Sequence, residues 1–132
     1  MLAIIATLLA ALAALLHVYI FVMESVQWTQ PRVWKIFAIP SQEAAETTKP
    51  MAYNQGFYNL FLAIGAILGL ALFWAGGPDT TADVAGRTLV LFSLGSMAAA
   101  AMVLITTGSK YLRPALIQGT FPLIGFVLFL FA

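Results

Sequence analysis

The chain contains no cysteine, only one histidine and few charges, since Asp, Glu, Lys and Arg together make up 8% of its 132 residues. Without cysteine there are no disulfides, no thiolate nucleophile and no Cys-ligated zinc or iron–sulfur centre. A single histidine also argues against a tight transition-metal site, and we predict neither a metal nor a cofactor. Six basic and five acidic side chains give a formal net charge of +1, which excludes the basic surface that nucleic-acid binding requires.

Apolar residues dominate the composition instead. They account for 62% of the chain, and the mean hydropathy of +0.98 lies well outside the range of soluble domains. Four apolar runs are each long enough to cross a hydrocarbon core of about 30 Å as a helix. The first run has no basic residue before it and is longer than the apolar part of a signal peptide, so we interpret it as a retained span. We predict an all-α integral membrane four-helix bundle, a single transmembrane domain over residues 1–132, with spans at about 2–24, 53–74, 86–107 and 111–131.

The loops predict how the spans are connected. Short polar turns follow the second and third runs, so the last three helices should be sequential antiparallel neighbours. The long connection, Gln27 to Ala52, contains an aromatic and basic stretch between Pro31 and Pro40 that is typical of an interfacial segment in the headgroup layer. A short helix should then begin after Ser41 and end before Pro50. We interpret this connection as an interfacial connector or, alternatively, as a lid over the polar site described below.

Basic residues predict the orientation in the membrane. The first and third loops lie on the same side and hold all but one of the six basic residues, whereas the second loop holds only Arg87. Cytoplasmic loops carry the excess of Lys and Arg. We therefore expect a bacterial inner-membrane protein with both termini away from the cytoplasm. The basic residues on the cytoplasmic side are Arg32, Lys35, Lys49, Lys110 and Arg113.

Polar side chains within the spans are the candidate functional residues. His17 and Glu24 are seven residues apart, about 20° short of two helical turns, so they share a helix face. Such groups turn toward protein or water because hydrocarbon does not satisfy them. By helical rise, His17, Asn59 and Gln118 should fall in one layer about 9–12 Å inside the helix ends. We predict a polar pocket inside the bundle with the ligand-binding residues His17, Glu24, Asn54, Gln55, Tyr58, Asn59 and Gln118.

Three functions are compatible with this layer. The first is a binding or transport protein that holds a small amphiphile or a lipid headgroup, so that its partners are the bilayer and this ligand. The second is an enzyme on a lipid-soluble substrate with His17 as acid or base, although about 10 Å of helical rise separates His17 from Glu24. The third is a structural hydrogen-bond network, each bond contributing about 0.6 kcal/mol in membranes. Gly65 and Gly69 form a small-residue pattern suited to helix contact within the chain or with a second copy in a homo-oligomer.

Three stretches of the sequence resemble a known family. HVYIFVME at 17–24, NQGFYNLFLA at 54–63 and IQGTFP at 117–122 together are similar to the small bacterial and fungal membrane proteins catalogued as domain of unknown function thirteen-hundred-and-four. The resemblance covers nearly the whole chain, and NQGFYN is its most specific part. It implies a four-helix membrane fold and places Gly56 and the seven candidate residues at motif positions. It implies no particular activity, so the resemblance leaves the function open.

Overall fold

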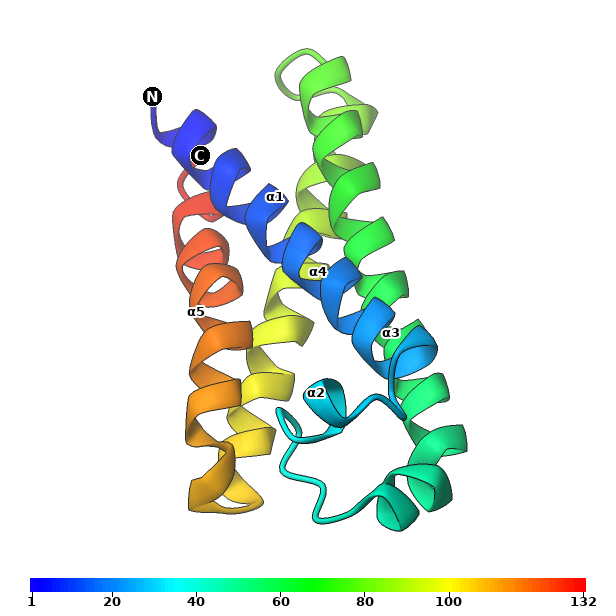
Figure 1. Cartoon of the computed structure of the whole chain (residues 1–132). Helices are drawn as coiled ribbons and strands as arrows, with labels where there is room; N and C mark the ends of the chain where they lie inside the picture. Colours follow the sequence, from blue (N-terminus) through cyan, green and yellow to red (C-terminus); the bar gives the residue numbers. More distant parts are fainter.

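The computed structural model describes all 132 residues and contains helices but no strands. A short helix, α2 (Pro31–Trp34), lies in the first connection. The other helices form four segments that are long and apolar enough to cross a membrane (Figure 1). The first segment, Leu2–Val26, consists of α1 (Leu2–Phe21) and a π-helical turn (Val22–Val26) that continues it. The second and third segments are α3 (Gln42–Ala75) and α4 (Thr81–Thr106). The fourth, Ser109–Phe129, consists of a 3₁₀ turn (Ser109–Tyr111) followed by α5 (Leu112–Phe129). The all-α membrane bundle predicted from the sequence is confirmed.

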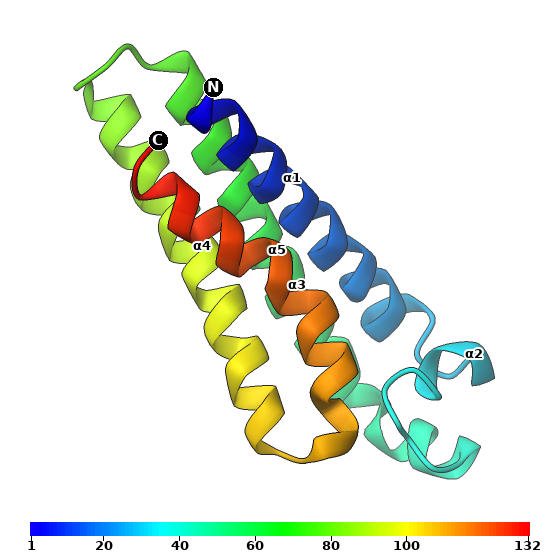
Figure 2. The same cartoon turned by 90° about the vertical axis from the view of Figure 1, so that its left-hand side faces the viewer.

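The four long helices form a square bundle. α1 and α4 lie at opposite corners, and each packs between α3 and α5. Consecutive helices α3, α4 and α5 are antiparallel neighbours, as the short turns predict (Figure 2). Both termini and the α3–α4 turn lie at one end of the bundle, whereas α2 and the α4–α5 turn lie at the other (Figures 1 and 2). The two ends therefore differ in structure, and the end with α2 holds most of the polar loop residues.

Small residues form the centre of the bundle, and large apolar residues point outward. The core face of α1 consists of fully buried alanines, and Leu94, Met97 and Phe129 fill the remaining space from α4 and α5. Leucines on the opposite face of α1 are exposed. This arrangement is typical of helices in lipid, where close packing of small side chains holds the bundle together and the outside needs no polar cover. The buried alanines of α1 are Ala6, Ala10, Ala13 and Ala14.

Glycines bring α3 and α4 into backbone contact. A Cβ atom on Gly86 would overlap the backbone nitrogen of Phe73, and a Cβ on Gly69 would lie 2.8 Å from the nitrogen of Val90. A Cβ on Gly65 would lie 2.6 Å from the hydroxyl of Ser93. The sequence is compatible with two kinds of helix contact for Gly65 and Gly69, one within the chain and one with a second copy of the protein. The structure uses both glycines within the chain, so the hypothesis that these glycines form a dimer face is wrong.

α3 does not stop before Pro50, which contradicts the short separate helix predicted there. Ser41 is the N-cap, as expected, and its hydroxyl accepts a hydrogen bond from the nitrogen of Ala44 at 3.1 Å. The helix then continues through Pro50 to Ala75. A proline inside a helix costs about 3 kcal/mol in isolation, but here tertiary contacts hold its first turns in place. With 34 residues, α3 is about 51 Å long, so its first turns extend beyond a hydrocarbon core of about 30 Å.

Two tryptophans of the first connection supply those contacts. The indole nitrogen of Trp28 donates to the carbonyl oxygen of Ala45 at 3.0 Å, and that of Trp34 donates to Oε1 of Gln42 at 3.1 Å. Trp28 is 7% exposed and Trp34 is 9% exposed. The N–H groups of both indoles thus find partners at the start of α3, and the position of this connection in the headgroup layer stays a prediction. The connection is folded onto α1 and α3.

A candidate amphiphile site between α1 and α5

The π-helical turn at the end of α1 brings Glu24 against α3. Asn59 donates a hydrogen bond from Nδ2 to Oε2 of Glu24 at 2.8 Å. The hydroxyl of Ser25 donates to the carbonyl oxygen of Tyr53 at 2.8 Å. Gly56 allows this approach, because a Cβ atom there would overlap the Ser25 hydroxyl. Glu24 and Asn59, two of the predicted site residues, are thus brought together across the α1–α3 contact.

His17 is also buried, but it does not join this pair. Its Nδ1 donates to the carbonyl oxygen of Ala13 at 2.8 Å, and its ring lies about 10 Å of helical rise from Glu24. The predicted layer of His17, Asn59 and Gln118 is therefore wrong, since Asn59 lies level with Glu24. The predicted layer assumes a helix start at residue 53, whereas α3 begins at Gln42 and its position is determined by packing against α1. The structure shows no His17–Glu24 dyad.

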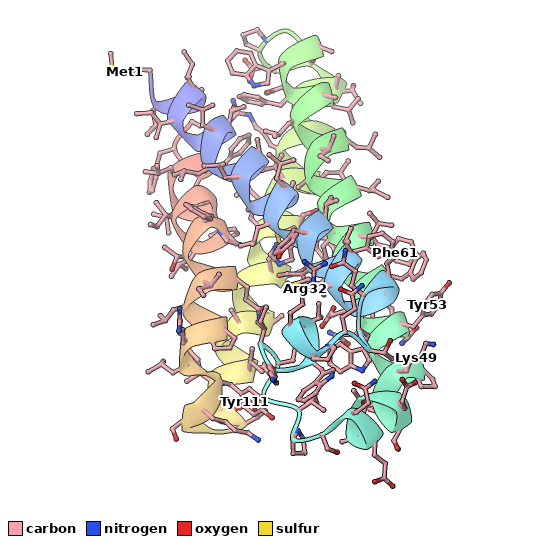
Figure 3. All side chains as sticks on the ribbon, in the orientation of Figure 1. Met1, Arg32, Lys49, Tyr53, Phe61 and Tyr111 are labelled. Atoms are coloured by element: carbon pink, nitrogen blue, oxygen red, sulfur yellow. The ribbon has the colours of Figure 1, made fainter.

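Three other predicted residues face outward. Asn54 and Gln55 are exposed, and Tyr58 is 54% exposed. Their inward orientation was inferred from the cost of polar groups in lipid, but α3 uses its small residues to contact α1. Figure 3 shows the neighbouring Tyr53 and Phe61 pointing away from the bundle on this outer side of α3. A role of Asn54, Gln55 and Tyr58 in ligand binding stays a prediction, and it does not involve the interior of the bundle.

A cavity lies on the other side of α1. It has a volume of about 540 Å³ and is enclosed by α1, the stretch Lys35–Ala38 after α2, and the first half of α5. In Figure 1, α1 and α5 diverge toward the end of the bundle that holds α2, and the connection lies between them. Gln118 is the one predicted site residue that lines this cavity. The connection thus lines a cavity that differs from the predicted polar site, and its role as a lid stays a prediction.

The cavity has an apolar wall and a cationic end. Its apolar lining comes mainly from α1 and from Phe37 and Ile117. Lys35, Lys110 and Arg113 line it from the connection and from the start of α5. In the sequence, these three cations indicate only the orientation of the chain in the membrane. The signal that could have identified them is the gathering of basic residues from two distant loops at the same end of the bundle, with no acidic residue near them in the sequence.

The wall formed by the connection has a defined backbone structure. The nitrogen of Ile39 donates to the carbonyl of Trp34 at 3.1 Å, and the nitrogen of Ala38 donates to that of Lys35 at 3.1 Å. Ala38 has a φ of 56°. Together these features form a Schellman motif, in which the left-handed position is usually a glycine. The connection therefore turns sharply at the cavity, held by backbone hydrogen bonds.

Other parts of the bundle offer less chemistry. A smaller cavity of about 100 Å³ between α4 and α5 is almost wholly apolar, and its Thr120 hydroxyl donates to the carbonyl of Leu116 at 2.6 Å. No three His, Asp or Glu side chains lie close enough together to hold a metal ion. Of these two cavities, the one between α1 and α5 is lined by cationic, polar and apolar groups together.

These features define the class of the protein: an integral membrane four-helix bundle with an amphipathic cavity on one side. Residues 11–130 match the family described as protein of unknown function (DUF1304), and the chain belongs to that family. The match confirms the resemblance inferred from the stretches around His17, Asn59 and Gln118. No curated protein and no solved structure matches the chain.

Proposed function

We propose that this protein binds an amphiphilic molecule from the bilayer in the cavity between α1, the α2–α3 connection and α5. The observation that supports this function is the lining of the cavity, which is apolar along the helices and cationic at one end. Its volume of about 540 Å³ falls in the range of about 300–1,000 Å³ that is typical of small-molecule sites. An amphiphile has the same two parts as this lining, a hydrocarbon chain and a polar group.

The order of the lining residues gives the ligand a direction. Leu16 and Met23 both line the cavity, and the step of seven residues from one to the other rises about 10 Å along the helix. Met23 lies near the end of the bundle that holds the cations, and Leu16 lies deeper. On α5, Arg113 is near that end and Gln118 is deeper. The ligand's polar group should therefore lie among the cations, with its chain along α1 toward the membrane interior.

The ligand has access from the side of the bundle. Tyr19, Ile36 and Ile117 line the cavity, and more than half of each side chain is exposed. In a membrane, the exposed surface between α1 and α5 faces lipid. An amphiphile that is already dissolved in the bilayer can thus reach the cavity without crossing water.

We place the cationic end of the bundle in the cytoplasm of a bacterial cell, with both termini on the opposite side of the inner membrane. The positive-inside rule supports this topology, because all basic residues except Arg87 lie at or near the end with α2 and the α4–α5 turn. The ligand would then be taken from the cytoplasmic leaflet. A transporter would need a second opening near the termini, whereas this cavity lies in the half of the bundle near α2.

A pair of matched tryptophan substitutions tests the proposal. Ile117 lines the cavity, whereas Ile124 does not; both lie on α5 two turns apart, and they are 54% and 45% exposed. Ile117→Trp should fill part of the cavity, and Ile124→Trp should add the same side chain to the lipid-facing surface. We would measure thermal unfolding in phosphatidylcholine nanodiscs with rising mole fractions of dodecyl phosphate, dodecanoate, dodecanol or dodecyltrimethylammonium.

A ligand that binds only the folded state raises the melting temperature. We expect a saturable rise with at least one dodecyl compound in the wild type and in Ile124→Trp, and a smaller rise in Ile117→Trp. The proposal fails if no compound gives a saturable rise, or if both tryptophan variants respond like the wild type.

A further inference from the structure

We infer that the amphiphile is an alkyl phosphomonoester, whose phosphate group lies among Lys35, Lys110 and Arg113. The inference rests on the proposed function, because it names the chemical class of the ligand that the cavity binds. The charges of the cavity lining, the absence of acidic partners for them, and the hydrogen-bond donors at that end support this class of ligand.

The three cations have no anionic partner in the protein. The single salt bridge lies between Arg87 and Asp83, at 3.0 Å, near the opposite end of the bundle. Lys35 and Lys110 each lie over an aromatic ring, Trp34 at 5.5 Å and Tyr111 at 4.8 Å. No acidic residue lines the cavity. The cationic end of the cavity thus has an excess of positive charge that an anionic ligand would neutralise.

Arg87 shows how the same chain treats a basic residue that has a structural role. Its Nε lies 3.0 Å from Oδ1 of Asp83, its Nη1 donates to the carbonyl oxygen of Ala132 at 2.6 Å, and its guanidinium lies 4.8 Å from the ring centre of Phe73. Arg113, in contrast, lines the cavity and makes no hydrogen bond to the protein. Its planar guanidinium is suited to two parallel hydrogen bonds with phosphate or carboxylate oxygens.

The number of charges favours phosphate over carboxylate. A carboxylate has one negative charge, and it would leave two of the three cations without compensation. A phosphomonoester has a charge of about −1.5 to −2 at pH 7 and three acceptor oxygens. It would neutralise most of the positive charge, and its oxygens could accept from the guanidinium of Arg113 and from both ammonium groups. A neutral or cationic headgroup would leave the whole charge excess in place.

The experiment compares four dodecyl compounds that differ only in the headgroup, together with inorganic phosphate, on the full-length protein in phosphatidylcholine nanodiscs. The variants are Arg113→Gln and Lys110→Gln, which remove lining cations. Their matched controls are Arg32→Gln and Lys49→Gln, since neither residue lines the cavity and Lys49 lies on the outer side of α3, away from it (Figure 3). Melting temperatures without ligand show whether each variant is folded.

We expect dodecyl phosphate to bind most tightly, and its affinity to fall as salt rises, since screening weakens exposed charge pairs. Arg113→Gln should weaken dodecyl phosphate binding about tenfold, as the loss of a charge-assisted hydrogen bond implies, and Lys110→Gln should act in the same direction. Dodecanol binding should change little in either variant. The two control variants should bind dodecyl phosphate like the wild type.

The possible contradictions separate this inference from the proposed function. If dodecanol binds as tightly as dodecyl phosphate, and neither Arg113→Gln nor Lys110→Gln weakens dodecyl phosphate binding, the ligand is not a phosphomonoester, while the proposed function stands. If dodecanoate binds as tightly as dodecyl phosphate, the phosphomonoester is overturned in favour of any single-chain anion. If inorganic phosphate stabilises the protein as strongly as dodecyl phosphate does, the dodecyl chain contributes nothing to binding, the site recognises free phosphate, and both proposals are overturned. If no dodecyl compound binds saturably, the proposed function fails and this inference fails with it.

Discussion

Asn59 and Asn54 are the same residue type, five positions apart on one helix, and the structure gives them different surroundings. Asn59 donates to the carboxylate of Glu24 at 2.8 Å, whereas Asn54 is exposed and makes no side-chain hydrogen bond to the protein. Removing one partner from a buried pair leaves the other group unsatisfied. The two asparagines therefore provide an internal comparison of a buried polar contact with a surface amide.

We expect Asn59→Ala to lower the free energy of unfolding by about 1–2 kcal/mol, because the Glu24 carboxylate loses its hydrogen-bond donor inside the bundle. Asn54→Ala should change the stability by less than about 0.5 kcal/mol, as is usual for surface substitutions. Denaturant unfolding in detergent micelles measures both. Equal effects of the two substitutions would show that the Glu24–Asn59 contact does not stabilise the fold.

The sequence predicts that polar side chains in the spans need hydrogen-bond partners, but it does not identify those partners. The burial of His17 and Glu24 follows from the cost of polar groups in hydrocarbon. The partner of Glu24 depends on the π-helical turn at Val22–Val26. No residue in this segment predicts a π-helical turn from the sequence. Ala38 is a similar case, since its left-handed backbone occupies a position where glycine would have been the sequence signal.

The ends of the helices are determined by local sequence signals in some places and by tertiary contacts in others. The four apolar runs predicted four spans because length and hydropathy act within each segment. Pro50 was expected to end a helix on local grounds, but the hydrogen bonds from Trp28 and Trp34 to the start of α3 come from residues distant in the sequence. Local patterns contain no information about such contacts, so the separate short helix was predicted where one continuous helix exists.

The α3–α4 contact gives a prediction for a pair of glycines on α4. Alanine usually stabilises a helix interior relative to glycine by up to about 1 kcal/mol. A Cβ atom on Gly86 would overlap the backbone of Phe73, which has no way to move without separating the helices. We expect Gly86→Ala to destabilise the protein by about 1–3 kcal/mol, the usual range for overpacking, as measured by thermal or denaturant unfolding.

Gly95 is the matched control on the same helix. A Cβ there would lie 3.2 Å from the ring of Phe126, a side chain that can shift slightly. Gly95→Ala should therefore be neutral or slightly stabilising. A Gly86→Ala protein as stable as Gly95→Ala would mean that α3 and α4 do not make this backbone contact.

The molecule as a whole has an asymmetric distribution of charge, and the absence of cysteine makes its topology easy to measure. We expect a cysteine at Glu43, at the start of α3, to react with a membrane-impermeant maleimide only after cells are broken. A cysteine at Asp79, in the α3–α4 turn, should react in intact bacterial spheroplasts. The physical reason is the excess of Lys and Arg at the end with α2. Labelling of the Glu43 position in intact spheroplasts would reverse the orientation.

The cavity depends on how the helices pack together, and the sequence alone does not predict that packing. The fold class followed from composition and run length, but the cavity arises where α1 and α5 diverge, and divergence is a property of packing. Gln118 was identified as polar and inward-facing, whereas Lys35 and Arg113 were assigned only to loops. They meet because the first and third loops share one end of the bundle. The sequence gives that shared end but not the distance between the loops.

Because Tyr19, Ile36 and Ile117 are exposed at the cavity, the fraction of protein with bound ligand depends on the concentration of ligand in the bilayer. A ligand that arrives by lateral diffusion is present at a mole fraction of the bilayer and not at an aqueous molarity. Diluting such a sample with buffer leaves occupancy almost unchanged, whereas adding lipid lowers it. The same total amount of ligand would thus fill the site in a small membrane area and leave it empty in a large one, which makes the occupied fraction a measure of membrane composition.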